Sequence, residues 1–322
     1  MKIITSLSDI QADKNSVVSV GTFDGVHRAH QKIIREAVSR AIQRHGRSVV
    51  VTFQPHPKEV LAAHRASTNG GHSAALPPDI LTTHEEKLAL LEQLGVDVAM
   101  VVNFTYEFSR KSFRDFYTEY IVNGIGAAEV IEGYDHSFGR DREAGLKELI
   151  ELGKEFQFSV IAEKPFKVGD EVVSSSRIRS LLLAGKISDA NALLGRRYSF
   201  KGTIVRGDKR GRTLGFPTAN IQIDHPRKLI PGNGIYAVRI QVDESWHYGL
   251  MNIGVLPTFF DSHPRKIEVY IYDFDEDIYE HTIVVECLEW IRSEQKFHSV
   301  DALIAQMNDD KESGKRIIES IS

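Results

Sequence analysis

The sequence predicts a two-domain α/β protein in which a parallel sheet covered by helices is followed by a small antiparallel β-barrel. Short apolar strands alternate with helices in the first half of the 322-residue chain, as expected for βαβ units. From Tyr198 onward the chain instead carries six closely spaced runs that alternate apolar and polar residues, with no helix between them. Such runs are typical of a small closed barrel.

Five apolar segments of the first half are predicted strands, and four segments with apolar residues at helical spacing are predicted helices. The strands are Val17–Val20, Ser48–Phe53, Val96–Val102, Ala128–Glu132 and Ser159–Glu163. The helices run from about His30 to Arg44, Glu85 to Leu94, Ser112 to Ile121 and Glu143 to Phe156.

Residues 62–79 interrupt this alternation with small residues, Gly and Pro. We expect a surface loop there that is poorly ordered without a ligand, because its composition cannot bury enough apolar area. Its His64 and His72 are interpreted as solvated side chains, since no cysteine or carboxylate nearby has the spacing of a metal site.

The second half begins with two short helices, Ser176–Leu183 and Ile187–Leu194, and the domain boundary is placed between residues 183 and 184. The predicted barrel strands are Ser199–Val205, Thr218–Ile223, Tyr236–Val242, Tyr248–Ile253, Lys266–Tyr272 and His281–Trp290. An amphipathic helix over Ser299–Ile321 is expected to pack on the barrel, with a break near Gly314.

Composition excludes several classes of protein. No run of about 18 apolar residues is present, so no transmembrane helix is expected, and the N-terminus lacks the pattern of a secretory signal. The net charge of −4, without a lysine-rich arm, argues against nucleic-acid binding. Cys287 is the only cysteine and lies in an apolar strand pattern, so we expect an inert core thiol in a cytoplasmic protein.

A glycine-rich basic segment, residues 206–220, is the most informative motif of the chain. It reads R-G-D-K-R-G-R-T-L-G-F-P-T-A-N. Glycines let backbone N–H groups approach phosphate oxygens, and basic side chains supply the countercharge. Thr218 and Asn220 share one face of an extended segment and offer oxygen ligands suited to Mg²⁺. The alternative is a glycine-rich hairpin loop that leads into a strand.

A second motif follows the first predicted strand and leads into a helix. It reads G-T-F-D-G-V-H-R-A-H over residues 21–30. Helix N–H groups at such a loop favour anions. His27 and His30 can donate to phosphate oxygens and stabilise charge that develops on a leaving pyrophosphate. The alternative is a helix-capping turn with two exposed histidines.

The segment 211–220 resembles the phosphate- and metal-binding motif of riboflavin kinases, whose core is P-T-A-N. Similar segments follow in order: G-N-G-I-Y-A at 232–237, M-N-I-G-V-L-P-T-F at 251–259, I-E-V-Y-I-Y-D at 267–273 and I-R-S-E-Q-K-F at 291–297. The residues that the resemblance implies for ATP binding are Gly207, Lys209, Gly211, Gly215, Thr218 and Asn220, with Thr218 and Asn220 also holding Mg²⁺. Those implied for flavin binding are Asn252, Thr258 and Arg292.

The same resemblance implies that Glu268 is the catalytic base, which takes the proton of the ribityl 5′-hydroxyl as that oxygen attacks the γ-phosphate. Strand alternation places Glu268 on the face of Tyr270 and Tyr272, opposite Ile267 and Ile271. We expect a barrel-lining carboxylate on a wet pocket. The alternative is a strand glutamate that faces outward. Tyr270 stands where the family usually has histidine.

The first half is similar to bacterial FAD synthetases of the nucleotidyltransferase superfamily. Residues 21–30 resemble that family's G-x-F-D-G-V-H-x-G-H form, 51–57 its T-F-x-P-H-P strand end, 130–139 its flavin-side loop and 173–179 its I-S-S-T-x-I-R motif. The residues implied for ATP binding are Gly21, Phe23, Asp24, His27, His30, Ser175, Ser176 and Arg179, with His27 and His30 also catalytic. Those implied for flavin binding are His56 and Asp135. Ala29 and Ser176 depart from the family's glycine and threonine, and Tyr134 and His136 alter the flavin-side loop.

Together the resemblances cover residues 16–320 and imply a bifunctional riboflavin kinase/FMN adenylyltransferase family. A Rossmann-like nucleotidyltransferase domain at 1–183 would convert FMN and ATP to FAD and pyrophosphate, and a kinase barrel at 184–322 would convert riboflavin and ATP to FMN and ADP. The alternatives are a kinase with a degraded N-terminal scaffold, a non-catalytic flavin sensor, and a nucleotidyltransferase for another acceptor. The expected partners are these small molecules, without nucleic acid or membrane, and a homo-oligomer is left open.

Overall fold

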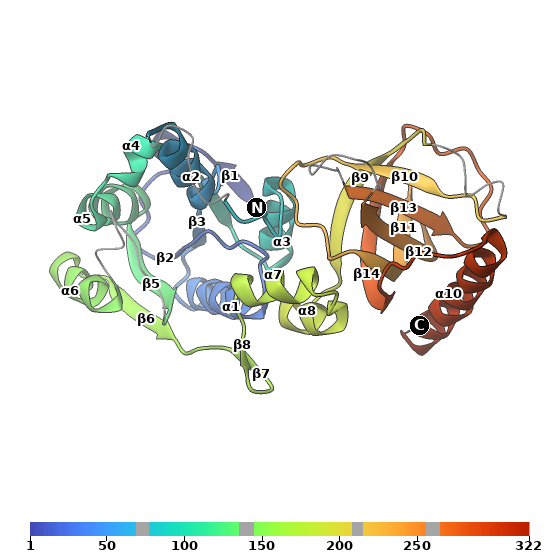
Figure 1. The fold of residues 1–322 in the computed structure, drawn as a ribbon. Helices are drawn as coiled ribbons and strands as arrows, with labels where there is room; N and C mark the ends of the chain where they lie inside the picture. The colour runs from blue at the N-terminus through green and yellow to red at the C-terminus, as the bar shows by residue number, and fades with distance from the viewer. Residues whose placement is uncertain (69–76, 135–144, 208–214, 256–264, 322) are drawn as a thin grey trace. The chain divides into compact units, whose positions relative to one another are not determined.

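The computed structural model describes residues 1–68, 77–134, 145–207, 215–255 and 265–321, and these belong to two compact units (Figure 1). The first unit is Met1–Ser174 and the second is Ser175–Ser322. Helix α7 (Ser175–Leu183) belongs to the second unit, whereas the boundary placed between residues 183 and 184 assigns it to the first. No helix among the described residues is long and apolar enough to cross a membrane.

A six-stranded parallel sheet forms the centre of the first unit, with strand order β1-β4-β3-β2-β5-β6. Its strands are β1 (Lys2–Ile4), β2 (Ser16–Val20), β3 (Ser48–Gln54), β4 (Val98–Asn103), β5 (Ala127–Gly133) and β6 (Ser159–Glu163). The five predicted strands are confirmed, and the short edge strand β1 was not predicted. Strand order reverses at β2, so the loop after β2 lies at the carboxyl-terminal edge where sheets of this kind bind ligands.

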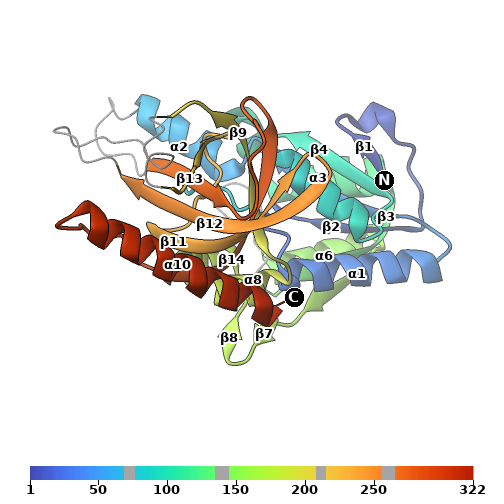
Figure 2. The ribbon, with the colours of Figure 1, turned by 90° about the vertical axis from the view of Figure 1, so that its right-hand side faces the viewer.

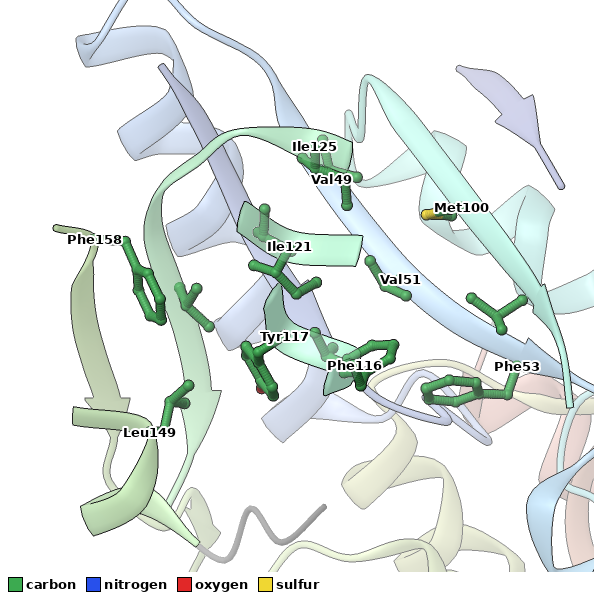
Figure 3. Packing of buried hydrophobic residues seen from close by; sticks show 14 of the residues in the cluster. Val49, Val51, Phe53, Met100, Phe116, Tyr117, Ile121, Ile125, Leu149 and Phe158 are labelled. Carbon is green, nitrogen blue, oxygen red and sulfur yellow. The ribbon is translucent and has the colours of Figure 1, made fainter. Parts of the chain in front are cut away.

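Helices cover both faces of this sheet, because its strands carry apolar side chains on each side. Buried residues of the helical segments η2 and α6 form one cluster on one face with alternate residues of β3 and β4 and with β5, and Figure 3 shows Leu149 of α6 on the β5 side of this cluster. Ile34 of α1 and Leu91 of α3 pack on the other face against Val50. The four predicted helices are confirmed: α1 (Arg28–Gln43), α3 (His84–Gln93), α5 (Phe113–Phe116) continued by the π-helix η2 (Tyr117–Ile125), and α6 (Leu146–Phe156).

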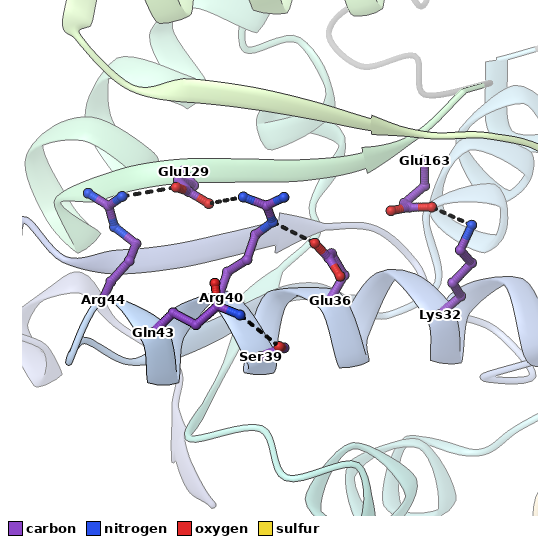
Figure 4. A network of polar contacts seen from close by, with 8 residues as sticks. All are labelled: Lys32, Glu36, Ser39, Arg40, Gln43, Arg44, Glu129 and Glu163. Atoms are coloured by element: carbon purple, nitrogen blue, oxygen red, sulfur yellow. Dashed lines mark hydrogen bonds and ion pairs between the residues drawn. The ribbon is translucent and has the colours of Figure 1, made fainter.

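Ion pairs attach helix α1 to strands β5 and β6 (Figure 4). The Glu129 carboxylate of β5 accepts from Arg40 at 3.3 Å and from Arg44 at 2.9 Å. Nearer the start of the helix, Lys32 lies 2.6 Å from Glu163 of β6. Glu129 is buried, whereas the three cations are 36–46% exposed and remain partly in contact with solvent, which weakens such pairs. Their effect is to connect α1 with the part of the sheet that lies beyond the reversal at β2.

Part of the segment that was predicted to be a surface loop is helical. Helix α2 (Pro57–Thr68) includes residues 62–68, so the loop expected over 62–79 is wrong for that stretch. Proline suits the first turn of a helix and alanine has the highest helix propensity, and α2 contains both. His64 stacks on Tyr106, with ring centroids 3.4 Å apart. Residues 69–76, which include His72, lie outside the described residues, so the disorder expected there stays a prediction. The remaining short elements are η1 (Leu7–Asp9), α4 (Tyr106–Ser109), β7 (Lys167–Val168) and β8 (Glu171–Val172).

The second unit contains the predicted closed six-stranded barrel. The order around the barrel is β10-β13-β12-β11-β14-β9, and all neighbours are antiparallel. Its strands are β9 (Tyr198–Val205), β10 (Ala219–Ile223), β11 (Gly234–Val242), β12 (Ser245–Val255), β13 (Arg265–Ile271) and β14 (Thr282–Arg292). The helices α7 and α8 (Ile187–Leu194) precede it, and α10 (Val300–Ile321) follows it.

Alternate residues of each strand fill the barrel interior. On β13, Ile267, Val269 and Ile271 are buried, whereas Glu268 and Tyr270 between them are only partly buried. Cys287 on β14 is fully buried, and burial raises the pKa of its thiol to about 12. The predicted core position of this cysteine is confirmed. A thiol that stays protonated is a poor nucleophile, which agrees with the inertness expected of it.

Helix α10 lies along the outer side of the barrel and is continuous through Gly314, so the break predicted there is wrong (Figure 2). Gly314 is buried. A Cβ added to it would lie 2.5 Å from Tyr272 Oη and 2.6 Å from Leu250 Cδ2. Ile318, one turn later, packs with Ala237 of β11. The absence of a side chain at Gly314 therefore allows helix α10 to pack close to the barrel.

We expect Gly314→Ala to destabilise the second unit. A Cβ at either of these distances forces neighbouring side chains to move, which typically costs about 1–3 kcal/mol. The gain in helix propensity offsets at most about 1 kcal/mol of this. Thermal unfolding of Gly314→Ala, with the exposed Glu319→Ala as control, would test the packing. A variant at least as stable as wild type would contradict it.

Candidate active sites

The loop between β2 and α1, residues 21–27, has an unusual backbone conformation. Phe23 and Val26 have positive φ angles of 47° and 36°, a region that L-residues seldom occupy and that is especially unfavourable for β-branched side chains. Gly25 lies between them with φ of 86°. Strained conformations persist only where surrounding contacts determine them. Two sets of contacts do so here.

The first set holds Asp24, which is buried. Its Oδ1 accepts from the backbone N–H groups of Leu81 at 2.9 Å and Thr82 at 3.0 Å. The Thr82 hydroxyl oxygen in turn accepts from the Gly25 N–H at 3.0 Å. Asp24 was expected to contact ATP, but these bonds direct its carboxylate to the protein. They join residues 21–27 to the segment that leads into α3.

The second set belongs to Lys87 of α3. Its Nζ donates to the Thr22 carbonyl at 3.2 Å, the Thr52 hydroxyl at 2.9 Å and the Phe53 carbonyl at 3.4 Å. The Thr52 hydroxyl also donates to the Thr22 carbonyl, at 3.2 Å. Burial lowers the pKa of the Lys87 ammonium to about 8, and the Asp24 carboxylate opposes this shift. One buried cation therefore connects residues 21–27 with the end of β3.

His27 and His30 lie together where α1 begins. His27 is the N-cap, and its Nδ1 accepts from the His30 N–H at 3.4 Å. Their rings stack with centroids 3.5 Å apart, and Phe23 meets the His30 ring edge-on at 5.3 Å. The capping alternative is thus correct for the His27 side chain, but His27 is buried and not exposed. Both imidazoles lie at a helix N-terminus, where N–H groups favour anions.

The other residues expected in this site lie on separate elements. Gly21 directly follows β2, and its N–H donates to the Val51 carbonyl of β3 at 3.0 Å. His56 immediately precedes α2, and its Nδ1 accepts from the Lys58 N–H at 3.1 Å. The rest of the set is Ser175, Ser176 and Arg179 on the first turns of α7 in the second unit, and Asp135, which lies outside the described residues.

Hydrogen-bond register aligns five residues in one row across the outer face of the barrel, here called the outer row. Asn220 of β10 pairs with Glu268 of β13, which also pairs with Asn252 of β12. Asn252 pairs with Ile235 of β11, which pairs with Arg292 of β14. Directly paired residues present their side chains on the same face. The structure thus brings together four of the residues expected in a kinase site.

Glu268 lies on the outer face of the barrel, so the expectation that it lines the barrel is corrected. Its side chain is 25% exposed, and its Oε1 lies 3.0 Å from Lys266 Nζ. The alternative of an outward-facing glutamate is therefore correct for the orientation of the side chain. Its surroundings are nevertheless those of a polar site, because both cross-strand neighbours of Glu268 are asparagines. The Oδ1 atom of Asn252 is buried and has no hydrogen-bond partner among the described residues. Such an atom indicates that a ligand or water completes the site.

Gly207 adjoins the side chain of Asn220. A Cβ at Gly207 would lie 2.0 Å from Asn220 Nδ2, so only glycine permits this approach. Phe216 is buried and meets Tyr270 edge-on, with centroids 5.4 Å apart. Of the other residues expected here, Gly215 and Thr218 lie just before β10, and Lys209, Gly211 and Thr258 lie outside the described residues.

Arg292, at the end of the outer row, is held by helix α10. Its Nε and Nη2 donate to the two carboxylate oxygens of Asp310, each at 2.7 Å. Asp310 is buried and also accepts from Gln306 at 3.0 Å. The Arg292 Nη1 donates to the Ser293 carbonyl at 2.9 Å. A bidentate pair of this kind fixes the plane of the guanidinium.

Sequence reasoning missed Lys87, Asp310 and Glu132. Lys87 lies four residues before Leu91 on the buried side of α3, and Asp310 occupies the equivalent kind of position on α10. A charged residue at apolar helical spacing is a usable signal, because such residues are rarely buried without a partner. Glu132 accepts from the Val20 N–H at 2.8 Å at the reversal of strand order. No local pattern distinguishes it.

Two family models match the chain. The model described as FAD synthetase matches residues 9–177, and the model described as riboflavin kinase matches residues 194–318. The bifunctional riboflavin kinase/FMN adenylyltransferase of Listeria monocytogenes is 38% identical over 306 residues, which are 95% of this chain and 93% of the relative. The Escherichia coli protein of the same name is 32% identical over 314 residues, 97% of this chain and 96% of the relative.

A solved structure is similar along almost the whole chain. It is a crystal structure named as a macrolide-efflux protein from Streptococcus pneumoniae, 31% identical in sequence, with a TM-score of 0.84. The similarity covers 97% of this chain and 98% of that chain. Sequence and fold comparisons therefore extend over both compact units.

The lowered pKa of Lys87 predicts a pH-dependent difference between wild type and Lys87→Met. Between about pH 8 and 10.5 the unfolded chain binds more protons at this lysine than the folded one, so the free energy of unfolding of wild type rises with pH. Relative to the variant it should rise by about 3 kcal/mol across that window. Urea unfolding followed by circular dichroism at both ends of the window measures this. A difference that does not change with pH would contradict it.

Proposed function

Because the chain belongs to the bifunctional riboflavin kinase/FMN adenylyltransferase family, we propose that its two reactions take place at the two sites described above. The chain phosphorylates riboflavin to FMN and adenylylates FMN to FAD. We assign the first reaction to the outer row and the second to residues 21–30. A kinase with a degraded N-terminal scaffold is disfavoured, because the FAD synthetase model matches residues 9–177. The observation that carries the assignment is the pairing of Glu268 with Asn220 and Asn252.

In the kinase reaction, Glu268 accepts the proton of the riboflavin 5′-hydroxyl while that oxygen bonds to the γ-phosphorus of ATP and the bond to ADP breaks. Its place on the outer face supports this role, because a substrate can reach it without entering the apolar interior. Lys266 beside it holds the carboxylate in place. Asn252 and Arg292 contact the flavin, together with Thr258, and Gly207, Lys209, Gly211 and Gly215 cradle the phosphates.

Thr218 and Asn220 fit a Mg²⁺ ion by their chemistry. Both supply neutral oxygen ligands, and they lie two positions apart, Thr218 just before β10 and Asn220 within it. The Asn220 amide occupies the space that a Cβ at residue 207 would fill, so Gly207 allows the amide to take this position. When bound, Mg²⁺ supplies positive charge to the phosphate oxygens of ATP.

In the adenylyltransferase reaction, a phosphate oxygen of FMN attacks the α-phosphorus of ATP, and pyrophosphate leaves as the α–β bridging bond breaks. His27, His30 and the N–H groups of α1 stabilise the charge on these phosphates. The stacking of the two rings supports a joint role, since one anion can contact both. Gly21 and Phe23 shape the nucleotide side, Ser175, Ser176 and Arg179 bind ATP phosphates, and His56 and Asp135 contact FMN.

The proposal also includes a division of labour between residues 1–183 and 184–322, and a cytoplasmic location. The two family models support the division, because the FAD synthetase model ends at residue 177 and the riboflavin kinase model begins at residue 194. The free, buried thiol of Cys287 is consistent with a reducing compartment. Asp24, by contrast, acts through the protein, because its carboxylate binds residues 81–82.

We expect His30→Ala to slow FAD formation from FMN by about 10²–10³-fold, because removing one donor from a site of developing charge commonly costs that much. FMN formation from riboflavin should persist, since the kinase site lies in the other compact unit. Chromatography of both products from one preparation measures the two rates. Undiminished FAD synthesis would show that His30 does not stabilise this charge. It would then be only a side chain at the start of helix α1.

Glu268→Gln should lower the kinase rate by about 10²–10⁴-fold, because glutamine keeps the size of the side chain but cannot take a proton. The barrel should stay folded, and FAD formation from supplied FMN should continue.

The matched control is Glu276→Gln, the same chemical change at an exposed position of the second unit. It should leave both rates unchanged. Kinase activity of Glu268→Gln within a few-fold of wild type would show that Glu268 is not the base. A parallel loss of both activities would contradict the assignment of two separate sites.

A further inference from the structure

Lys87 belongs to none of the motifs that assign the adenylyltransferase site, yet its ammonium contacts two of them. We propose that Lys87 is a positioning residue for FAD synthesis, which together with Thr52 holds residues 21–27 in the conformation that presents His27 and His30 to the substrates. The inference rests on the proposed function of residues 21–30. Lys87 itself does not contact substrate in this proposal, because its hydrogen-bonding groups are directed to the protein.

The donors of Lys87 are matched by protein acceptors. An ammonium has three N–H donors, and Nζ lies within hydrogen-bond distance of the Thr22 carbonyl, the Thr52 hydroxyl and the Phe53 carbonyl. Thr52 adds a direct bond to Thr22. The three groups form a closed triangle of contacts between α3, β3 and the loop after β2. Loss of any one of these three groups leaves a buried polar group without its hydrogen-bond partner, which destabilises the folded state.

The position of the triangle along the chain explains why its loss would affect the histidines. Thr22 immediately precedes Phe23, the first residue with positive φ, and Val26, the next such non-glycine residue, immediately precedes His27. Residues 22 and 24 are thus both tied to the protein while the backbone around them is strained. Release of Thr22 lets Phe23 relax toward ordinary φ values. Phe23 packs edge-on against His30, so that relaxation displaces the imidazole.

Charge favours the same arrangement. Asp24 is buried in the same loop, and its carboxylate stabilises the charged form of Lys87 through space. His84, one turn earlier on α3, is the other titratable group that senses Lys87, and its pKa is lowered by burial first and by Lys87 second. A neutral residue at position 87 would remove this attraction, while the hydrogen bonds of Asp24 to residues 81–82 would remain.

The main test is steady-state FAD synthesis from FMN by Lys87→Met in the full-length protein. We expect kcat to fall about 10²-fold with KM for ATP and FMN within a few-fold of wild type, because small displacements of catalytic groups cost about this much in rate. The matched control is Lys32→Met, which removes a lysine on α1 that is 46% exposed and pairs with the partly buried Glu163. The control should keep wild-type kcat. FMN formation from riboflavin should be unchanged in both variants.

A milder pair of variants guards against loss of folding. Thr52→Val keeps the shape of the side chain but removes the hydroxyl that joins Lys87 to Thr22, and Thr52→Ser keeps that hydroxyl. We expect Thr52→Val to lower kcat about 10-fold and Thr52→Ser to stay within about twofold, since a positional effect follows the hydrogen bond. The double variant Lys87→Met/Thr52→Val should be no slower than Lys87→Met alone, because residues of one network are not additive.

Three results would each overturn the proposal: unchanged kcat in Lys87→Met, equal losses in Thr52→Val and Thr52→Ser, or a fully additive double variant. The outcome is separable from that of the proposed site. If His30→Ala loses FAD synthesis while Lys87→Met keeps it, residues 21–30 remain the site and only the positioning role fails. If His30→Ala also keeps it, the site assignment itself fails.

Discussion

The antiparallel register of the barrel strands determines which polar side chains meet, and the proposed kinase site depends on it. A shift of β13 by one residue would turn Glu268 into the interior and an isoleucine to the surface. Burial of Ile267, Val269 and Ile271 opposes such a shift. The apolar residues that stabilise the barrel therefore also align Glu268 with Asn220 and Asn252. Arg292, at the far end of the row, is aligned in addition by the bidentate bond to Asp310.

The first unit meets a different constraint, because charged groups must be buried beside a loop with unfavourable backbone angles. Asp24 accepts several bonds from residues 81–82, Lys87 donates to three oxygens, and Glu132 caps the N–H of Val20. Buried charges destabilise a fold unless they have such partners. The same bonds make the loop stiff, which suits a site that must present N–H groups and imidazoles in fixed places.

Periodicity predicted most of the architecture, because it reports burial directly. The alternation of β13 predicted that Glu268 shares a face with Tyr270, but not that this face is the outer one, and the apolar stripe of α1 predicted that helix. Resemblance to known motifs added the chemical roles, which no pattern of burial contains. The bond of Asp24 to Leu81 could not be predicted, because it joins residues 57 positions apart. The break expected at Gly314 was wrong because local propensity does not reveal that a barrel approaches the helix there.

Two connections of the barrel begin and end at paired residues: Val205 is opposite Asn220 in the β9–β10 pair, and Val255 is opposite Arg265 in the β12–β13 pair. The strands on either side are registered by their own hydrogen bonds, so the number of residues between them does not alter the pairing. Lengthening such a connection costs little closure entropy. The register of the catalytic strands is therefore independent of the length of residues 206–219 and 256–264, although residues proposed to bind phosphate, Mg²⁺ and flavin lie within them. An insertion between those residues could change how a substrate is held without moving Glu268 relative to Asn220 and Asn252.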